Sequence, residues 1–493
     1  MSPGDTGFLG PSFVPVPQPT GGTIVDQDAA IRLGKALFWD MQAGSDGKIA
    51  CASCHFQAGT DGRTHLSMHP GPDHAWGGGN DVVGSSGVLS MSFTGISTDL
   101  NDAVDICAPV TPGDDSQALI ASSGHRLVTG RQAPPAVGAV FYLDNFWDGR
   151  ASHQFNGQNP LGTGVPIAGI ASLASQAVGP PGSDVEMACA GRKFNGPNSL
   201  GAKLVPRTPL ALQFVDPTDS VLGPLSNAPG NGLECGFADR PCTYGDLIAA
   251  AFGTGGLSGQ AAADAYVADF ASIWGQAVAA YEATLIPDRT PYDRGVLTPA
   301  QVSGLDEFRQ RCAGCHTEPE FTDASVRIIT ENGGTGVPDA TGSDQGFHNI
   351  GASASSDDPG RKGSPGGTYH TAASGALDFN NGAFKTPALR NVKLTAPYMH
   401  NGKLPTLASV LDFYKGVGQI QNPEIDPEAT AGVSGGSFDD VLDFLANGLT
   451  DCRVEHDLAP FDHPSLVLPY GNLDGSDRTL PARGAAGDGT ACP

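Results

Sequence analysis

Two short motifs with the same residue pattern carry the clearest chemistry in the sequence. Residues 51–55 read Cys-Ala-Ser-Cys-His, and residues 312–316 read Cys-Ala-Gly-Cys-His. A Cys-x-x-Cys-His segment is the attachment site of a c-type haem, in which the cysteines hold the porphyrin and the histidine binds the iron. Zinc is the alternative partner of a Cys-x-x-Cys pair, but a histidine directly after each pair and a separation of about 260 residues are atypical of zinc sites. We therefore predict two covalently bound haem c groups, held by Cys51, Cys54, His55, Cys312, Cys315 and His316.

The six other cysteines point to an oxidising compartment. Thioether attachment of haem is normally completed outside the cytoplasm, where disulfides persist, and six is an even number. We expect Cys235 to pair with Cys242 and Cys452 to hold the tail through Cys492, while the connectivity is otherwise open. The first residues have neither the basic nor the apolar region of a signal peptide. We expect a periplasmic or extracellular protein whose leader is absent from this sequence.

Composition excludes several classes of function. The 493 residues contain 27 Lys and Arg against 52 Asp and Glu, a formal charge of −25. This charge repels nucleic acid and anionic lipid, and it favours a basic partner such as a small cationic redox protein. No apolar run approaches the ~18 residues of a membrane helix. The 68 glycines and 39 prolines predict long ordered loops around modest helices.

The predicted helices stand next to the two motifs. A helix over 26–40, capped by Asp26, leads to the first motif, and a helix behind Thr298 leads to the second through a capping box and a proline at its first position. Apolar residues three and four apart predict a long helix over 259–285. Two later helices are expected over 407–414, behind Thr406, and over 438–447, behind Ser437.

The fold expected from this pattern is mainly α, with almost no strand signal. It consists of two cytochrome c-like haem domains with long irregular loop insertions, because each motif follows a short helix and precedes another. The predicted units are an extended arm (1–22), an N-terminal haem domain (23–287) with an insertion at about 56–130, a C-terminal haem domain (288–471) and a tail (472–493).

Further motifs carry a family resemblance. Residues 384–416 contain Phe-Lys-Thr-Pro-Ala-Leu-Arg-Asn and Pro-Tyr-Met-His-Asn-Gly, and residues 145–151 read Asn-Phe-Trp-Asp-Gly-Arg-Ala. Together with the haem motifs, these segments resemble the bacterial diheme cytochrome c peroxidase family, which includes MauG. The resemblance implies an oxidoreductase that uses hydrogen peroxide at an open N-terminal haem. A six-coordinate C-terminal haem then stores or relays electrons, a small redox protein or protein substrate donates them, and dimers are common.

The resemblance also implies metal ligands. His55 and His316 become the proximal iron ligands, and Tyr414 aligns where family members have a ligating Met or Tyr. A buried core tyrosine is the alternative role for Tyr414, with Met399 and His400 as other ligand candidates. The carbonyl groups of Thr395 and Pro397 match positions that bind one calcium ion between the haem domains, although an ordinary turn has the same sequence.

Four residues are the candidate catalytic side chains by resemblance. Asn145 stands where peroxidases have a distal glutamine, Trp147 is expected near a haem, and Arg131 is a candidate for a propionate or a developing negative oxygen. The family's distal glutamate, which moves the proton that O–O cleavage requires, is replaced by Phe155. An aromatic there is similar to rubber oxygenase, so dioxygen-dependent oxygenase chemistry is one alternative. Pure electron transfer is another, with the first haem closed by one of four insertion histidines: His65, His69, His74 or His125.

Overall fold

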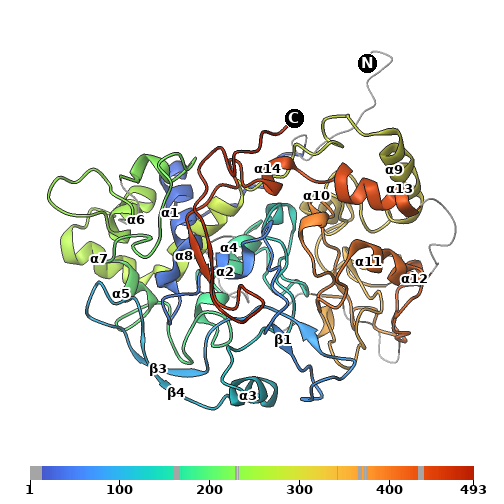
Figure 1. The fold of residues 1–493 in the computed structure, drawn as a ribbon, viewed down its shortest axis with the longest axis horizontal. Helices are drawn as coiled ribbons and strands as arrows, with labels where there is room; N and C mark the ends of the chain where they lie inside the picture. The colour runs from blue at the N-terminus through green and yellow to red at the C-terminus, as the bar shows by residue number, and fades with distance from the viewer. Residues whose placement is uncertain are drawn as a thin grey trace.

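The elements fall into two halves that lie side by side (Figure 1). A computed structural model describes residues 14–158, 167, 169–227, 230, 232–340, 342–364, 369–370, 372, 376–430 and 438–493. The first half, up to residue 287, carries the first haem motif, and the second half, from residue 288, carries the second motif. Each half has its own apolar core, and a smaller third cluster around residues 139–142 packs with Leu173 and Ala324.

Packing of α1 on α8 forms the centre of the first half. The helix α1 begins as predicted, since the Ala29 N–H donates to Asp26 Oδ1 over 2.9 Å. Gly34 allows the two helices to approach, because a Cβ at this position would overlap the Ala277 carbonyl. The helices of this half are α1 (Gln27–Trp39), α2 (Ala52–His55), α3 (Asp115–Ser122), α4 (Ser172–Ala177), α5 (Leu200–Leu204), α6 (Tyr244–Phe252), α7 (Gly259–Ala268) and α8 (Phe270–Glu282).

The prediction of one helix over 259–285 is wrong in its continuity. The segment forms α7 and α8, which are separated by Asp269 with φ −116° and ψ 22°, outside helical values. The side chain of Asn195 accepts a hydrogen bond from the Ala271 N–H over 2.8 Å, so a distant residue caps the new helix start. The second helix also ends at Glu282, before the predicted end.

The second half begins with the predicted helix behind Thr298. Its capping box is present, as is a second box in which Thr406 and Ser409 cap α11. The predicted helix over 438–447 is present as α13 followed by a π-helical turn, and its proposed cap, Ser437, lies outside the described residues. The helices of this half are α9 (Pro299–Arg311), α10 (Val326–Glu331), α11 (Leu407–Tyr414), α12 (Pro427–Thr430), α13 (Phe438–Asp443), the π-helix η8 (Phe444–Gly448) and α14 (Cys452–Glu455).

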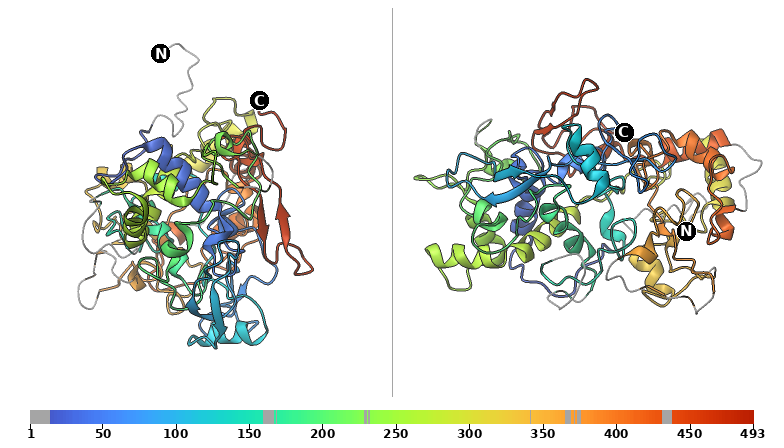
Figure 2. Two further views of the ribbon diagram at one scale, coloured as in Figure 1. Left: turned by 90° about the vertical axis from the view of Figure 1, so that its left-hand side faces the viewer. Right: turned by 90° about the horizontal axis from the view of Figure 1, so that it is seen from below.

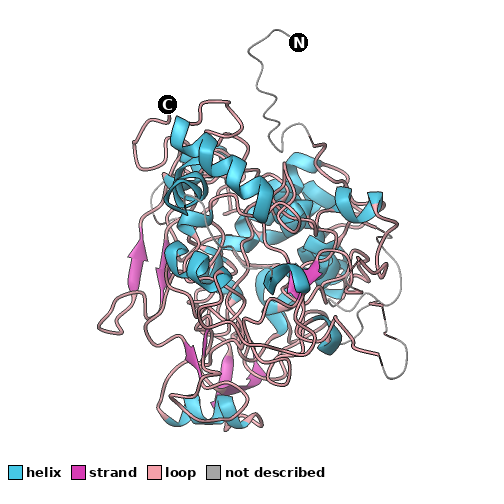
Figure 3. Cartoon of the chain, turned by 90° about the vertical axis from the view of Figure 1, so that its right-hand side faces the viewer, coloured by secondary structure: helices cyan, strands magenta, loops and turns pink. Residues whose placement is uncertain are grey.

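Short strands and single 3-10 turns complete the architecture, and loops connect most of these elements (Figure 3). The sequence analysis predicts almost no strands, whereas the described residues form four two-stranded antiparallel sheets. Most of these strands have only two or three residues, too few for an alternating pattern to be visible. The pairs are β1 (Met68–His69) with β2 (Val82–Val83), β3 (Met91–Gly95) with β4 (Ile106–Pro109), β5 (Phe347–His348) with β6 (Phe384–Lys385), and β7 (Leu466–Leu468) with β8 (Arg478–Leu480). The 3-10 turns are Met41–Ala43, Ala139–Phe141, Pro180–Gly182, Gly223–Leu225, Arg361–Gly363 and Val392–Leu394.

The end of the chain returns to the first half. Val454, Phe461, Leu466 and Leu468 are buried in the first core, and β7 contacts α2 of the first motif. The strands β7 and β8 therefore lie beside the first half, as the red segment in Figures 1 and 2 shows. The predicted C-terminal unit (288–471) thus contributes residues to both cores.

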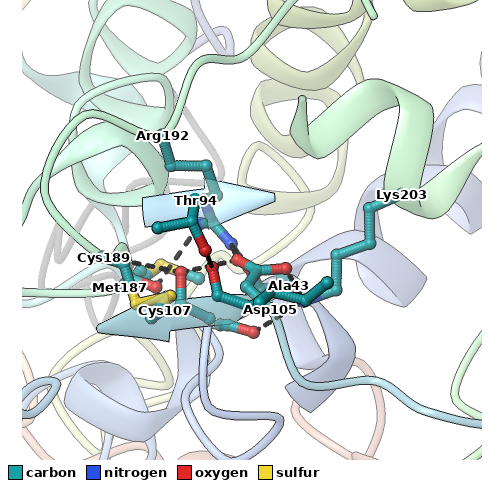
Figure 4. The surroundings of a disulfide bond; sticks show 11 residues. Ala43, Thr94, Asp105, Cys107, Met187, Cys189, Arg192 and Lys203 are labelled. Carbon is teal, nitrogen blue, oxygen red and sulfur yellow. Dashed lines mark hydrogen bonds and ion pairs between the residues drawn. A yellow bond between two sulfur atoms is a disulfide. The ribbon is translucent and has the colours of Figure 1, made fainter. Parts of the chain in front are cut away.

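Three disulfides, two of them between residues 40 or more positions apart, leave the motif cysteines free. The predicted pairs Cys235–Cys242 and Cys452–Cys492 are present, and Cys107 pairs with Cys189. Beside this third bond, the buried Asp105 carboxylate forms ion pairs with Arg192 over 3.0 Å and with Lys203 over 2.9 Å (Figure 4). Burial lowers the pKa of Lys203 to about 8 despite this carboxylate. The disulfide and the ion pairs fix the long insertion onto the first half.

No helix in the described parts of the chain is long and apolar enough to cross a membrane.

Candidate functional site

The first motif forms a short helix in the core of the first half. His55 lies at the end of α2, where its Nδ1 is 2.7 Å from the Gly59 carbonyl. Nδ1 therefore carries the proton, and Nε2 keeps the lone pair that binds iron. Burial lowers the pKa of His55, which keeps the imidazole neutral. Cys51 and Cys54 are both free, as haem attachment requires. Burial raises the pKa of Cys54 to about 12 and that of Cys51 well above its usual value, so both thiols are protonated.

The second motif repeats this arrangement at the end of α9. The Nδ1 atom of His316 faces two backbone carbonyls, those of Pro387 at 3.1 Å and Phe321 at 3.2 Å. Its Nε2 is thus also the atom available for iron, and burial lowers its pKa. Cys312 and Cys315 are free, and burial raises the pKa of Cys312 to about 11.

A cavity of about 220 Å³ opens in front of the second motif. Cys312, Cys315 and His316 line it together with Tyr414 from the last position of α11. Burial raises the pKa of Tyr414, with the two motif cysteines nearby as further causes. The structure therefore brings Tyr414 into the same cavity as the second motif.

Met399 and His400, the other ligand candidates, also line this cavity. The His400 ring stacks on Phe384 with 3.6 Å between centroids, and its Nε2 lies 3.0 Å from Ser353 Oγ. Burial lowers the pKa of His400 to about 3, so the ring is neutral. His463 lies elsewhere, stacked on Trp39 in the first half at 4.6 Å.

Residues of the first half close the other side of the cavity. Trp147 lines it with Thr60 and Gln132, and its Nε1 donates to the Gln132 carbonyl over 2.7 Å. Its ring meets that of His400 edge to face at 6.4 Å. Trp147 is thus an aromatic ring in a cavity that residues of both motif-bearing halves line.

Comparison with known proteins finds similarity to one family over part of the chain. Residues 28–205 match the family model described as di-haem cytochrome c peroxidase. The chain is 32% identical over 146 residues to the methylamine utilization protein MauG of Methylorubrum extorquens, and 33% identical over 198 residues to the cytochrome-c peroxidase IdrP2 of Denitromonas iodatirespirans. Residues 28–205 therefore resemble the di-haem cytochrome c peroxidase family. These matches cover 28% and 34% of the chain, and 33% and 46% of the two relatives, so the chain spans less than half of either relative.

Three further proteins match a larger part of the chain. The cytochrome c peroxidase Ccp of Escherichia coli is 23% identical over 386 residues, which are 76% of this chain and 51% of that protein. Among solved structures, a MauG-like protein associated with microbial copper homeostasis covers 91% of this chain and 97% of its own, with 19% identity and a TM-score of 0.47. The diheme peroxidase BthA of Burkholderia thailandensis covers 89% and 93%, with 17% identity and a TM-score of 0.43.

Asn145 and Phe155 are both buried. The Asn145 amide donates to Ser172 Oγ over 2.8 Å, and its oxygen accepts from Lys385 Nζ over 3.3 Å. Burial lowers the pKa of Lys385 to about 7. Phe155 is 0% exposed and belongs to the first core, where its ring packs against Gly275 of α8.

The charged candidates are engaged in ion pairs. Arg131 bridges two carboxylates, Asp148 at 2.7 Å and Asp358 at 2.5 Å. Arg150 pairs with Asp148 over 3.0 Å. His153, two residues before Phe155, pairs with Asp144 over 2.9 Å. Their present contacts are therefore structural, and Arg131 links the segment before Trp147 to the second half.

Gln132 is a buried residue of this cavity that the sequence analysis did not single out. Its Nε2 donates to the Asp61 carbonyl, whereas its buried Oε1 has no hydrogen-bond partner. Gln132 lines the same cavity as Thr395 and Pro397, the two residues predicted to offer carbonyl oxygens. An unpartnered amide oxygen near two carbonyl groups suits a hard cation. Sequence offered no signal for this residue, because its missing partner is visible only in the fold.

Glu282 is a second residue that the sequence analysis missed. It lines a small cavity beside the first motif together with Cys51, Cys54 and His55, and it is 3% exposed. A buried carboxylate at this place carries no sequence signal, since the end of α8 reads as an ordinary apolar helix.

Proposed function

We propose that this chain is a di-haem oxidoreductase that reduces hydrogen peroxide in the periplasm, as a cytochrome c peroxidase or MauG does. A small redox protein or a protein substrate is the electron donor. The observation that carries the proposal is the cavity of the second motif, which Trp147 and Gln132 of the first half complete. Haem c at each motif would supply the redox chemistry, in which hydrogen peroxide, two electrons and two protons give two water molecules.

The chain's own residues have three roles in this proposal. His55 and His316 offer a neutral Nε2, and Tyr414 offers its phenol oxygen to the second haem. Trp147 provides an aromatic path between the halves, held by the Gln132 carbonyl. Asn145 is anchored by Ser172 and Lys385, so its amide has a fixed orientation.

Electron paramagnetic resonance of the oxidised protein tests the proposal. We expect one high-spin and one low-spin haem, and added peroxide should deplete both ferric signals together. Two low-spin signals in the oxidised protein, with no open haem site formed on reduction, would instead support pure electron transfer. In the described residues, the candidate ligands for that alternative, His65, His69, His74 and His125, are not among the side chains that line the small cavity beside the first motif.

Tyr414→Phe should change the spectrum of the low-spin haem. The substitution removes only the phenol oxygen, and axial ligands set haem potentials across ~0.8 V, so we expect its potential to rise by on the order of 0.1 V. Tyr398→Phe is the matched control, because Tyr398 lines the same cavity but its hydroxyl donates to the Val392 carbonyl over 2.9 Å. An unchanged spectrum in Tyr414→Phe would remove Tyr414 from the coordination sphere.

Gln132→Leu should abolish stabilisation by calcium. Calcium at 100 times its dissociation constant should raise the free energy of unfolding of the native protein by about 2.7 kcal/mol, and a chelator should reverse this. Gln132→Asn keeps an amide oxygen and should retain part of the effect, while Gln421→Leu, on an exposed loop, should retain all of it. Calcium titration followed by thermal denaturation measures the effect, and equal stabilisation of Gln132→Leu would exclude this ligand.

A further inference from the structure

Glu282 has a buried carboxylate to which the proposed function above gives no role. It is the last residue of α8, it is 3% exposed, and its Oε2 atom has no hydrogen-bond partner. A buried carboxylate without a partner is costly when charged, so it favours the protonated form. Accordingly, burial raises the pKa of Glu282 to about 8.

The register of α8 connects Glu282 with the missing distal carboxylate. Gly275 and Glu282 are seven residues apart, which places them on the same face of the helix two turns from one another. Phe155, at the family position of the distal glutamate, packs on Gly275, where an added Cβ would lie 2.7 Å from its ring. One face of α8 therefore contacts the Phe155 ring at Gly275 and, two turns later, carries the carboxyl group of Glu282.

The residues around Glu282 line the small cavity beside the first motif. The cavity that Glu282 lines is also lined by Gln176 and Ala177 of α4, by Phe38 of α1, and by the motif residues Cys51, Cys54 and His55. The carbonyl of Ala174, one turn before Ala177, lies beside Gly275. The helices α4 and α8 thus enclose both Phe155 and Glu282.

The neighbouring titratable groups leave Glu282 without a counter-charge. Glu186 lines the same cavity, and burial raises its pKa as well. His55 and the two motif cysteines are neutral, and α4 contributes the amide of Gln176. The buried Lys35 of α1 is held by Asp219 at 2.8 Å and by Asp462, and it does not line this cavity. No lysine or arginine lines this cavity within the described chain.

We propose that Glu282 is the proton-transfer residue of the first haem site and takes the place of the absent distal glutamate. This inference rests on the proposed peroxidase function. As the O–O bond of hydrogen peroxide breaks, Glu282 donates its proton to the departing oxygen, which leaves as water. The proton of the other oxygen returns to the carboxylate. Over a full cycle the redox partner supplies two electrons and solvent supplies two protons, giving a second water molecule.

Glu282→Gln in the haem-loaded protein tests the proposal. Glutamine has the same shape and no charge, so haem content should be unchanged. The rate of the peroxide reaction, followed by stopped-flow absorbance, should fall about 10²–10⁴-fold, the usual contribution of general acid–base catalysis. The native rate should decline as the pH rises through about 8, where the acid form is lost, and the variant should lack this decline.

Infrared difference spectroscopy gives a readout that is independent of turnover. The native protein should show the carbonyl band of a protonated carboxyl group that disappears between pH 7 and 9, and Glu282→Gln should lack it. Glu186→Gln, a matched change in the same cavity, should keep the band. Absence of the band from the native protein, or an equal peroxide rate in Glu282→Gln, would overturn the proposal.

The reaction of the native protein with peroxide distinguishes failure of the proposed peroxidase function from failure of the role proposed for Glu282. A native protein that does not react with peroxide refutes the peroxidase function, whereas a native protein that reacts while Glu282→Gln reacts equally refutes only the role of Glu282. If Glu282→Gln loses haem, Glu282→Asp is used, because it withdraws the carboxyl group by one methylene. An intermediate rate with a displaced pH inflection is then expected, and an unchanged rate and inflection would overturn the proposal.

Discussion

A variant in which Cys51 and Cys54 are both alanine should carry one covalently bound haem instead of two and should no longer react with hydrogen peroxide. Both cysteines are free and buried beside His55, and they are the only attachment points at this site. Loss of both thioethers therefore removes the haem that the proposal assigns to peroxide. The mass of the denatured, acid-acetone-washed chain measures the haem count, and paramagnetic resonance should show that the high-spin signal is missing.

The second motif provides the matched control for this experiment. Cys312 and Cys315 changed to alanine should also leave one covalent haem, but here the low-spin signal should be missing. The remaining high-spin haem should still meet peroxide, without sharing the oxidation across Trp147. Loss of peroxide reactivity only in this second variant would reverse the proposed division of labour. A native chain that carries no covalently bound haem would contradict the proposed function.

Local sequence signals were sufficient for the elements that lead into the motifs. Asp26 caps α1, and the capping boxes at Thr298 and Thr406 begin α9 and α11, because each device involves residues only three positions apart. The motif residues themselves needed only their spacing. Tyr414 needed a family resemblance, and the structure adds that it shares a cavity with the second motif.

Features set by distant contacts were beyond the sequence. The break at Asp269 depends on Asn195, which lies 76 positions before the amide that it caps. The return of β7 to the first core is equally non-local. Gln132 and Glu282 are distinguished by the absence of a partner for a buried oxygen, and no residue type or spacing encodes such an absence.

Phe155→Ala should lower the free energy of unfolding by ~3–5 kcal/mol, the usual cost of removing a buried phenylalanine ring. The ring is 0% exposed and packs directly on Gly275 of α8. Phe155→Leu keeps most of the buried apolar volume and should cost less. Urea denaturation followed by tryptophan fluorescence measures the change, with Phe237→Ala as control because Phe237 is 43% exposed.

The size of this loss decides between two roles for Phe155. If the ring is core packing, the stability of Phe155→Ala falls and the choice of oxidant stays the same, since Glu282 and Asn145 remain in place. If the ring instead shapes an oxygenase pocket, as in the resemblance to rubber oxygenase, the variant changes its reaction with dioxygen while losing less than about 1 kcal/mol, because a pocket-lining ring is already partly unpacked. The enclosed position of Phe155 in the first core favours the first outcome.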